Sequence, residues 1–191
     1  MANFYQPSKQ PRATLKPGDI FINTSTFQPA HCGIVITNGG VIHATNKGIR
    51  EDDIETWGSE ADIFRPRPEM SKAESDAVCN VAKEIMGSAK YGLSRAMFKS
   101  TFASGSVGTG LRARLAKYRE RLRNDQGVVK HVYCSELTIL CYQLAWIDHD
   151  AVNEGHRLFI ALDGKHTWPS TLRRYLKGNS NWSFLGQYTP A

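Results

Sequence analysis

The chain of 191 residues carries a formal net charge of +6 at pH 7, and 41% of its residues are hydrophobic. This length fits a single domain spanning residues 1–191, and the hydrophobic share excludes a globally disordered chain. The positive charge favours acidic partners such as nucleic acid, an anionic membrane surface or acidic cell-wall polymers, without choosing among them. Because the sequence contains no run of ~18 apolar residues, we expect no membrane-spanning helix.

The cysteine spacing argues against a zinc ribbon, because no C-x-x-C pair occurs. A chain that can build a core does not need a disulfide framework, so we expect free thiols, a reducing compartment, and neither a metal ion nor a cofactor. The four thiols are Cys32, Cys79, Cys134 and Cys141. Residues 1–20 lack the apolar segment of a signal peptide, which predicts a protein made in the cytoplasm or exported by a route that reads no N-terminal signal.

Short strands are expected in the first third of the chain. Residues 20–22 form an apolar run after a Pro-Gly turn, and residues 31–37 are rich in β-branched side chains. Asn38-Gly39-Gly40 is typical of a hairpin turn, which makes residues 41–45 the returning strand. Residues 62–65 predict a further strand, ended by the prolines that follow it.

A first helix is predicted after these strands. Ser71 and Glu74 form a capping box, and apolar residues then recur at helical spacing until Gly87, a suitable C-terminal stop. Residues 100–110 are small and polar, which indicates a loop.

Residues 111–123 predict a second helix, with a narrow apolar stripe surrounded by basic side chains. One interpretation is a surface helix that packs on one thin face; the other is a patch that docks on an anionic surface. The sequence lacks the aromatic interleaving of single-strand nucleic-acid grooves, so we expect no specific nucleic-acid partner. The basic residues are Arg112, Arg114, Lys117, Arg119, Arg121 and Arg123.

A third helix is predicted from about Cys134 to Trp146, and Cys134 is the residue best placed for chemistry. At a helix N-terminus, unpaired N–H groups and the helix dipole favour the thiolate. The backbone N–H there can also hold the oxyanion formed on an attacked carbonyl. The alternative is a small buried residue, which is how most free cysteines behave. Cys141, two turns later, is expected in the core. A short helix near Pro169 and a strand over residues 182–188 complete the chain.

Two histidines on the expected hairpin are candidate bases. His31 opens the first strand and His43 lies in the returning strand. A three-residue turn would pair Val35 with His43 and leave His31 roughly 13 Å away, at ~3.3 Å per residue. Contact between the two rings then requires strong twist, a bulge or another register. Asp52, Glu55 or a backbone group could orient His31 instead.

These motifs resemble the histidine hairpin of NlpC-like cell-wall peptidases, a branch of the papain fold. The matching segments are Lys16-Pro17-Gly18-Asp19-Ile20, His31-Cys32-Gly33-Ile34-Val35 and Val41-Ile42-His43-Ala44. Ordinary members carry the cysteine before the histidines. Here Tyr133-Cys134-Ser135-Glu136-Leu137 follows them, as in the circularly permuted branch.

The resemblance covers about residues 15–145, followed by a C-terminal extension. It implies an α+β, permuted papain-like fold, in which a small antiparallel sheet packs against helices and the nucleophilic cysteine lies at a helix N-terminus.

The resemblance also implies roles for individual residues. Cys134 would be the nucleophile, His31 the general base, and His43 the group that orients this base. Tyr133 would lie beside the thiol and donate to the oxyanion. We interpret Glu136 as structural, because the helix dipole favours a carboxylate in the first helical turn.

A related family offers a second function. The same motif order and histidine spacing occur in the lecithin:retinol acyltransferase family, which moves acyl chains between lipids. That family's cysteine motif is Asn-Cys-Glu-His-Phe, from which the sequence Tyr-Cys-Ser-Glu-Leu of this chain departs. The basic helix at residues 111–123 keeps the lipid hypothesis open.

Three functions therefore compete. The first is a cysteine hydrolase that forms an acyl-enzyme at Cys134, as an amidase or endopeptidase on peptidoglycan peptides. The second is a phospholipase or lipid acyltransferase that uses the same Cys-His-His site on membrane phospholipids. The third is a non-catalytic binding module.

The biological role is open at this point as well. A short chain without a signal also fits an antibacterial effector, delivered by a specialised secretion system to the periplasm of a target cell and paired with an immunity protein. A housekeeping amidase is the alternative.

Overall fold

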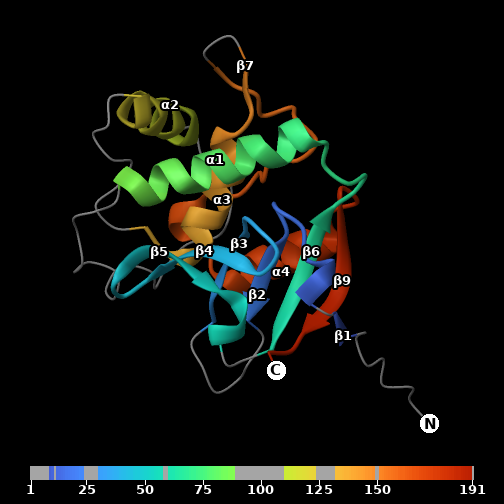
Figure 1. The fold of residues 1–191 in the computed structure, drawn as a ribbon. Helices are drawn as coiled ribbons and strands as arrows, with labels where there is room; N and C mark the ends of the chain where they lie inside the picture. The colour runs from blue at the N-terminus through green and yellow to red at the C-terminus, as the bar shows by residue number, and fades with distance from the viewer. Residues whose placement is uncertain are drawn as a thin grey trace.

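The computed structural model has a mixed α+β fold, which confirms the predicted class (Figure 1). One sheet and four α-helices make up most of the described chain. The structure describes residues 9–10, 12–23, 30–57, 60–88, 110–123, 132–148 and 151–190. The predicted loop at 100–110 falls outside these residues, apart from its last position.

The sheet has the strand order β1-β9-β6-β2-β3-β4-β5. All neighbours are antiparallel except β1 and β9, which are parallel. The strands are β1 (Lys9–Gln10), β2 (Ile20–Asn23), β3 (Cys32–Val35), β4 (Gly40–Thr45), β5 (Gly48–Asp53), β6 (Ala61–Pro66) and β9 (Trp182–Tyr188). The sheet is larger than the small one expected, because β5 joins one edge and the C-terminal strand β9 pairs with β6.

The predicted helices are all present. They are α1 (Lys72–Ser88), α2 (Gly110–Arg123), α3 (Cys134–Leu144) and α4 (Pro169–Gly178). The capping box of α1 forms as predicted: the Ser71 N–H donates to the Glu74 carboxylate at 2.8 Å, and the Glu74 N–H donates to the Ser71 hydroxyl at 3.2 Å. Smaller elements are β7 (Ile147–Asp148), β8 (Ala151–Val152) and the 3-10 turns η1 (Arg12–Thr14), η2 (Ile54–Trp57) and η3 (Gly164–His166).

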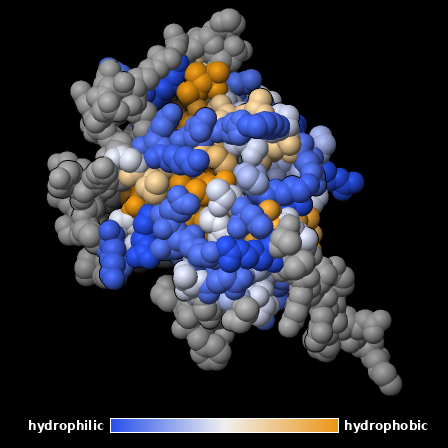
Figure 2. Space-filling model, viewed as in Figure 1, coloured by the Kyte–Doolittle hydropathy of each residue, from blue (hydrophilic) through white to orange (hydrophobic). Residues whose placement is uncertain are grey.

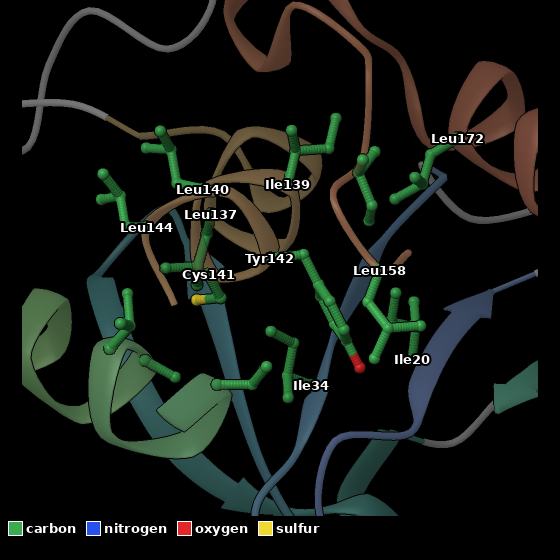
Figure 3. Packing of buried hydrophobic residues seen from close by; sticks show 14 of the residues in the cluster. Ile20, Ile34, Leu137, Ile139, Leu140, Cys141, Tyr142, Leu144, Leu158 and Leu172 are labelled. Atoms are coloured by element: carbon green, nitrogen blue, oxygen red, sulfur yellow. The ribbon is translucent and has the colours of Figure 1, made fainter. Parts of the chain in front are cut away.

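Helix α3 lies at the centre of the fold, between α1 and the sheet (Figure 1). Every residue from Ser135 to Leu144 is buried, so its polar side chains need partners inside the protein. Gln143 donates to the carbonyls of Ile160 and Leu162, each at 2.9 Å. In Figure 3, Cys141 and Tyr142 point from α3 toward the sheet, and Tyr142 reaches toward Ile34 and Ile20. Figure 2 shows that hydrophilic residues cover most of the described surface on the face it presents.

The two faces of the sheet carry two separate apolar clusters, as the period of two along each strand requires. The larger cluster joins the sheet to α1 and α3. From the sheet it includes Ile20, Ile22, Cys32, Ile34 and Ile42. The smaller cluster lies on the opposite face and takes Phe21, Val35, Val41, Ile54 and Ile63. His43 is therefore on the face opposite to Ile42, whereas Cys32 faces the helices.

The predicted register of the histidine hairpin is wrong. Strand β3 pairs Val35 with Val41 and Gly33 with His43, so His31 lies only one diagonal step from His43. The turn is longer than Asn38-Gly39-Gly40, because the N–H groups of Ile36 and Thr37 both donate to the Gly40 carbonyl, at 2.8 and 3.4 Å. The shifted register removes the separation of roughly 13 Å that the three-residue turn implied.

Gly33 makes this register possible, because a side chain at this position would meet the neighbouring strand. An ideal Cβ on Gly33 would lie 2.5 Å from the Ile42 carbonyl oxygen and 2.9 Å from the His43 Cβ. Such distances are well inside van der Waals contact, so any other residue would push β3 and β4 apart.

We predict that Gly33→Ala lowers the free energy of unfolding by about 1–3 kcal/mol, as overpacking of a close strand pair does. Gly87→Ala is the matched control: Gly87 lies in α1 with nothing near the added methyl group, and the change should stabilise the helix by roughly 0.5–1 kcal/mol. Denaturant unfolding of both variants checks the pair. Equal stability of Gly33→Ala and the parent would contradict the steric argument.

Candidate active site

Three side chains on one face of the sheet form a hydrogen-bonded chain. His31 Nε2 lies 2.7 Å from His43 Nδ1, and His43 Nε2 lies 2.7 Å from the Asp52 carboxylate. The backbone of His31 is fixed as well, because its carbonyl accepts the Asn23 N–H at 2.7 Å. His31 directly precedes β3, His43 lies in β4 and Asp52 lies in β5, so neighbouring strands of the sheet hold these contacts.

The proton positions in this chain follow from its acidic end. Arg50 pairs with Asp52 and, with His43, holds the pKa of the carboxyl below its usual range, so Asp52 is ionised and only accepts. His43 Nε2 must then carry the hydrogen. Burial lowers the pKa of His43, although Asp52 acts in the opposite direction. The lowered pKa keeps the His43 ring neutral, with Nδ1 as the acceptor. His31 therefore donates from Nε2, and its Nδ1 is left to accept a proton from another group.

Sequence reasoning named Asp52 but gave it the wrong partner, since Asp52 bonds to His43 and not to His31. Glu55, the other candidate, instead accepts the hydroxyl of Tyr188. The overlooked signal was the turn between β4 and β5. Gly48, at the end of this turn, has a φ of 110°, and its carbonyl accepts the Thr45 hydroxyl at 2.9 Å. A hairpin at this turn brings Asp52 one diagonal step from His43.

Trp57 is a site residue that sequence reasoning missed. Its ring stacks on His31 with a centroid distance of 4.6 Å and an interplanar angle of 23°. It also lies 5.0 Å from the His43 ring and 4.1 Å from the Phe21 ring. Packing on an aromatic plane restricts the tilt of both imidazoles, and no sequence motif identifies a residue in a short 3-10 turn for this purpose.

Cys134 is the first residue of α3, with Tyr133 as its N-cap in extended conformation. Its pKa lies well below the ordinary thiol range, mainly because Cys32 donates a hydrogen bond to it. A hydrogen bond and the charge of His31 act in the same direction, while burial opposes them. Cys134 thus interacts with His31, which in turn contacts His43, and Cys32 is an additional neighbour.

Cys32 is the first residue of β3, and its side chain is 0% exposed. Burial and the neighbouring Cys134 sulfur raise its pKa well above the usual value, so Cys32 remains a protonated donor. Thr138 links the two cysteines: its hydroxyl lies 3.7 Å from the Cys32 sulfur and 2.9 Å from the Cys134 carbonyl oxygen. Cys141 is fully buried, as predicted, and burial raises its pKa.

Glu136 supports the nucleophile from the first turn of α3. Its carboxylate accepts the Tyr133 N–H, which is the contact that a glutamate makes at this position of a capping box. Its side chain is 3% exposed, and burial raises its pKa to about 7. The charges that face it are Arg114 and Lys165, which lower the pKa, and Asp163, which raises it. The structural role expected for Glu136 fits these contacts, although its deep burial was not foreseen.

A hollow of about 560 Å³ opens beside the histidines. It is lined by Asn23, His31, His43, Thr45, Asn46, Lys47, Arg50, Asp52, Thr56 and Trp57. None of these side chains is aliphatic, so the hollow suits polar groups. A second hollow, of about 450 Å³, lies between Lys16, Glu69 and Lys83, and its lining includes none of the three candidate catalytic residues.

The basic helix is partly directed into the protein. Arg114 forms an ion pair with Asp163, and Arg119 is only 7% exposed. Lys117 is exposed, and the side chains of Arg112, Arg121 and Arg123 fall outside what the structure describes. These contacts favour the first of the two interpretations, a helix that packs on the fold.

Among the other described histidines, His156 Nε2 lies 3.7 Å from the Glu74 carboxylate. His156 stacks on Trp146 with a centroid distance of 3.8 Å, His166 ends η3, and His131 and His149 lie outside the described residues. In the described ranges, no group of three His, Cys, Asp or Glu residues could hold a metal ion. No helix in the same ranges is long and apolar enough to cross a membrane.

Comparison of the chain with protein-family models, with curated proteins and with solved structures gives no match.

We predict that Asp52→Asn lowers kcat/KM roughly 10- to 100-fold without unfolding the protein, because an amide can present either a donor or an acceptor to His43 and no longer fixes its tautomer. The pH profile of kcat/KM should shift as well. Glu51→Gln is the matched control, since Glu51 is exposed on the same strand and the change in charge is identical. Activity of Asp52→Asn equal to that of Glu51→Gln would remove Asp52 from the site.

We predict that Glu136 makes stability depend on pH. Its pKa of about 7 in the folded protein exceeds the ordinary value of 4.5, so its contribution to stability is complete below pH 4.5 and is lost as the pH rises through 7. Relative to Glu136→Gln, which cannot titrate, the parent should lose about 3 kcal/mol between these limits. Urea unfolding of both proteins at pH 4.5 and pH 8 measures the difference, and a difference that does not change with pH would contradict the prediction.

Proposed function

We propose that the chain is a cysteine hydrolase that cleaves amide bonds in peptidoglycan peptides through an acyl-enzyme at Cys134. The observation that carries this proposal is the hydrogen-bonded chain from His31 through His43 to Asp52, combined with a thiol of lowered pKa at the N-terminus of α3. A nucleophile, a base and an oriented third group are the parts that covalent catalysis requires.

The proposed reaction begins with transfer of the Cys134 proton to His31 Nδ1. The thiolate attacks the substrate carbonyl, and the backbone N–H of Cys134 at the helix N-terminus stabilises the oxyanion. Tyr133, which stands beside the thiol at the N-cap, is a second donor in this proposal. His31 then protonates the leaving amine, and the acyl-enzyme remains.

A water molecule completes the proposed cycle. Neutral His31 removes its proton, hydroxide attacks the thioester, and the thiolate leaves. Throughout both half-reactions His43 accepts from His31, while Asp52 prevents the His43 ring from turning over. The low pKa of Asp52 and the lowered pKa of His43 confine the moving proton to His31 and its partners.

We further propose that the fold is a circularly permuted papain-like one. The histidine hairpin precedes the cysteine helix in the chain, the sheet is antiparallel over six strands, and the cysteine begins a helix that packs against β3 and β4. These features support the order of motifs that the permuted branch of NlpC-like peptidases displays.

The polarity of the hollow beside the histidines favours a peptide over a phospholipid. A lipid acyl chain needs an apolar channel, and the lining of this hollow contributes Trp57 and two imidazoles as its least polar groups. Lys47 and Arg50 add positive charge to it, which suits the carboxylates of peptidoglycan peptides. The inward orientation of Arg114 and Arg119 also weakens the case for membrane docking.

Delivery as an antibacterial effector with an immunity partner remains part of the proposal.

We predict that purified protein releases new amino groups from muropeptides and that Cys134→Ser abolishes this activity, because a hydroxyl is not ionised at this pH. Cys141→Ser is the control: it should lower the melting temperature while retaining turnover, since Cys141 lies in the core. Phospholipid vesicles, assayed in parallel for fatty-acid release, test the alternative. Lipid hydrolysis without muropeptide cleavage would replace the proposal. Inactivity on both substrates, with no rapid alkylation of Cys134, would favour a binding module.

A further inference from the structure

The cysteine next to the base takes no covalent part in the proposed hydrolysis. Cys32 follows His31 directly, but alternation along the strand turns its side chain to the helix side of the sheet. A small apolar residue would fill the same space in the core but could not donate a hydrogen bond to Cys134. The thiol that stands there instead faces the candidate nucleophile.

Two elements distant in sequence hold the two sulfurs together. Cys32 starts β3 and Cys134 starts α3, and the two elements pack against each other. The Thr138 hydroxyl, one turn along α3 from Cys134, reaches the Cys32 sulfur at 3.7 Å while it bonds to the Cys134 carbonyl at 2.9 Å. The two thiols are also close enough for each to shift the pKa of the other. A disulfide requires the two sulfurs to close to ~2.05 Å.

We propose that Cys32 and Cys134 form a reversible disulfide when the protein meets hydrogen peroxide, and that this bond switches the hydrolase off. The effect on activity rests on the proposed function, whereas the formation of the bond does not. The pair is thus a modification site within the active centre.

The chemistry is balanced with peroxide as the oxidant. The Cys134 thiolate attacks one peroxide oxygen, the O–O bond breaks and hydroxide leaves. Cys134 is then a sulfenic acid. The Cys32 thiol then loses its proton and attacks the Cys134 sulfur. The S–S bond forms, the S–O bond breaks, and water leaves. Two thiols lose two electrons in total, and one peroxide gains them.

The two sulfurs have the distinct reactivities that this sequence needs. The lowered pKa of Cys134 makes it the attacking thiolate, and Cys32 is the resolving thiol beside it. Cys79 and Cys141 are both buried with raised pKa values, so they are poor first nucleophiles. Closure of the disulfide would also protect Cys134 from irreversible oxidation to the sulfinic acid.

The test treats the reduced full-length protein with hydrogen peroxide and measures the intact mass. We expect the loss of two hydrogens, a cross-linked peptide pair containing Cys32 and Cys134 after non-reducing digestion, and return of the original mass with dithiothreitol. Addition of oxygen without a cross-link, or a cross-link between other cysteines, would overturn the proposal.

Two variants sharpen the experiment. Cys32→Ser keeps the size of the side chain but cannot resolve the sulfenic acid, so peroxide should add two oxygens to Cys134, with no recovery by dithiothreitol. Cys79→Ser should cross-link as the parent does. Melting curves establish that both variants fold. Full reversibility in Cys32→Ser would also contradict the proposal.

The activity measurements separate this proposal from the hydrolase proposal. If the protein forms the cross-link but the reduced protein does not cleave muropeptides, the disulfide proposal stands and the hydrolase proposal fails. If the reduced protein cleaves muropeptides and peroxide abolishes this activity without forming a cross-link, the hydrolase proposal stands and the disulfide proposal fails.

Discussion

The close approach of β3 and β4 at Gly33 is the constraint on which the candidate site depends. Because Gly33 has no side chain, its strand lies against His43, and the ring of His31 is carried to the Nδ1 atom of that histidine. The pairing of β4 with β5 then brings Asp52 to the other nitrogen of the same ring. A polar chain across three strands thus follows from one backbone contact, and its geometry does not rely on long flexible side chains.

The second determinant is the burial of α3. From Ser135 to Leu144 the helix is buried, so its polar side chains need partners inside the protein. Glu136 accepts the Tyr133 N–H, and the Ser135 hydroxyl donates to the Thr167 carbonyl. These contacts fix the start of the helix against the segment before α4. Cys134 therefore has a defined position, and its contacts with Cys32 and His31 lower its pKa although burial opposes them.

The sequence predicted the helices well because their signals are local. The capping box at Ser71 and the apolar spacing of α1 need no knowledge of the rest of the chain. The hairpin register failed because Thr37 and Gly40 bond within the turn and lengthen it, which composition does not reveal. Strand β5 was missed because its Arg50, Glu51, Asp52 and Asp53 resemble a solvated loop, although charged residues are common on an edge strand. Trp57 and Cys32 gain their importance only from tertiary contacts.

The position of β9 has a consequence for biosynthesis. This strand lies between β1 and β6, and its pairing with β6 joins Phe64 to Phe184 across most of the chain length. Strand β1 joins the sheet through β9, so it cannot enter the sheet until β9 has been synthesised. Contacts this distant in sequence make folding slow relative to local helix formation. The sheet is therefore completed only after β9 has been synthesised, and until then one edge of β6 stays unpaired in the nascent chain.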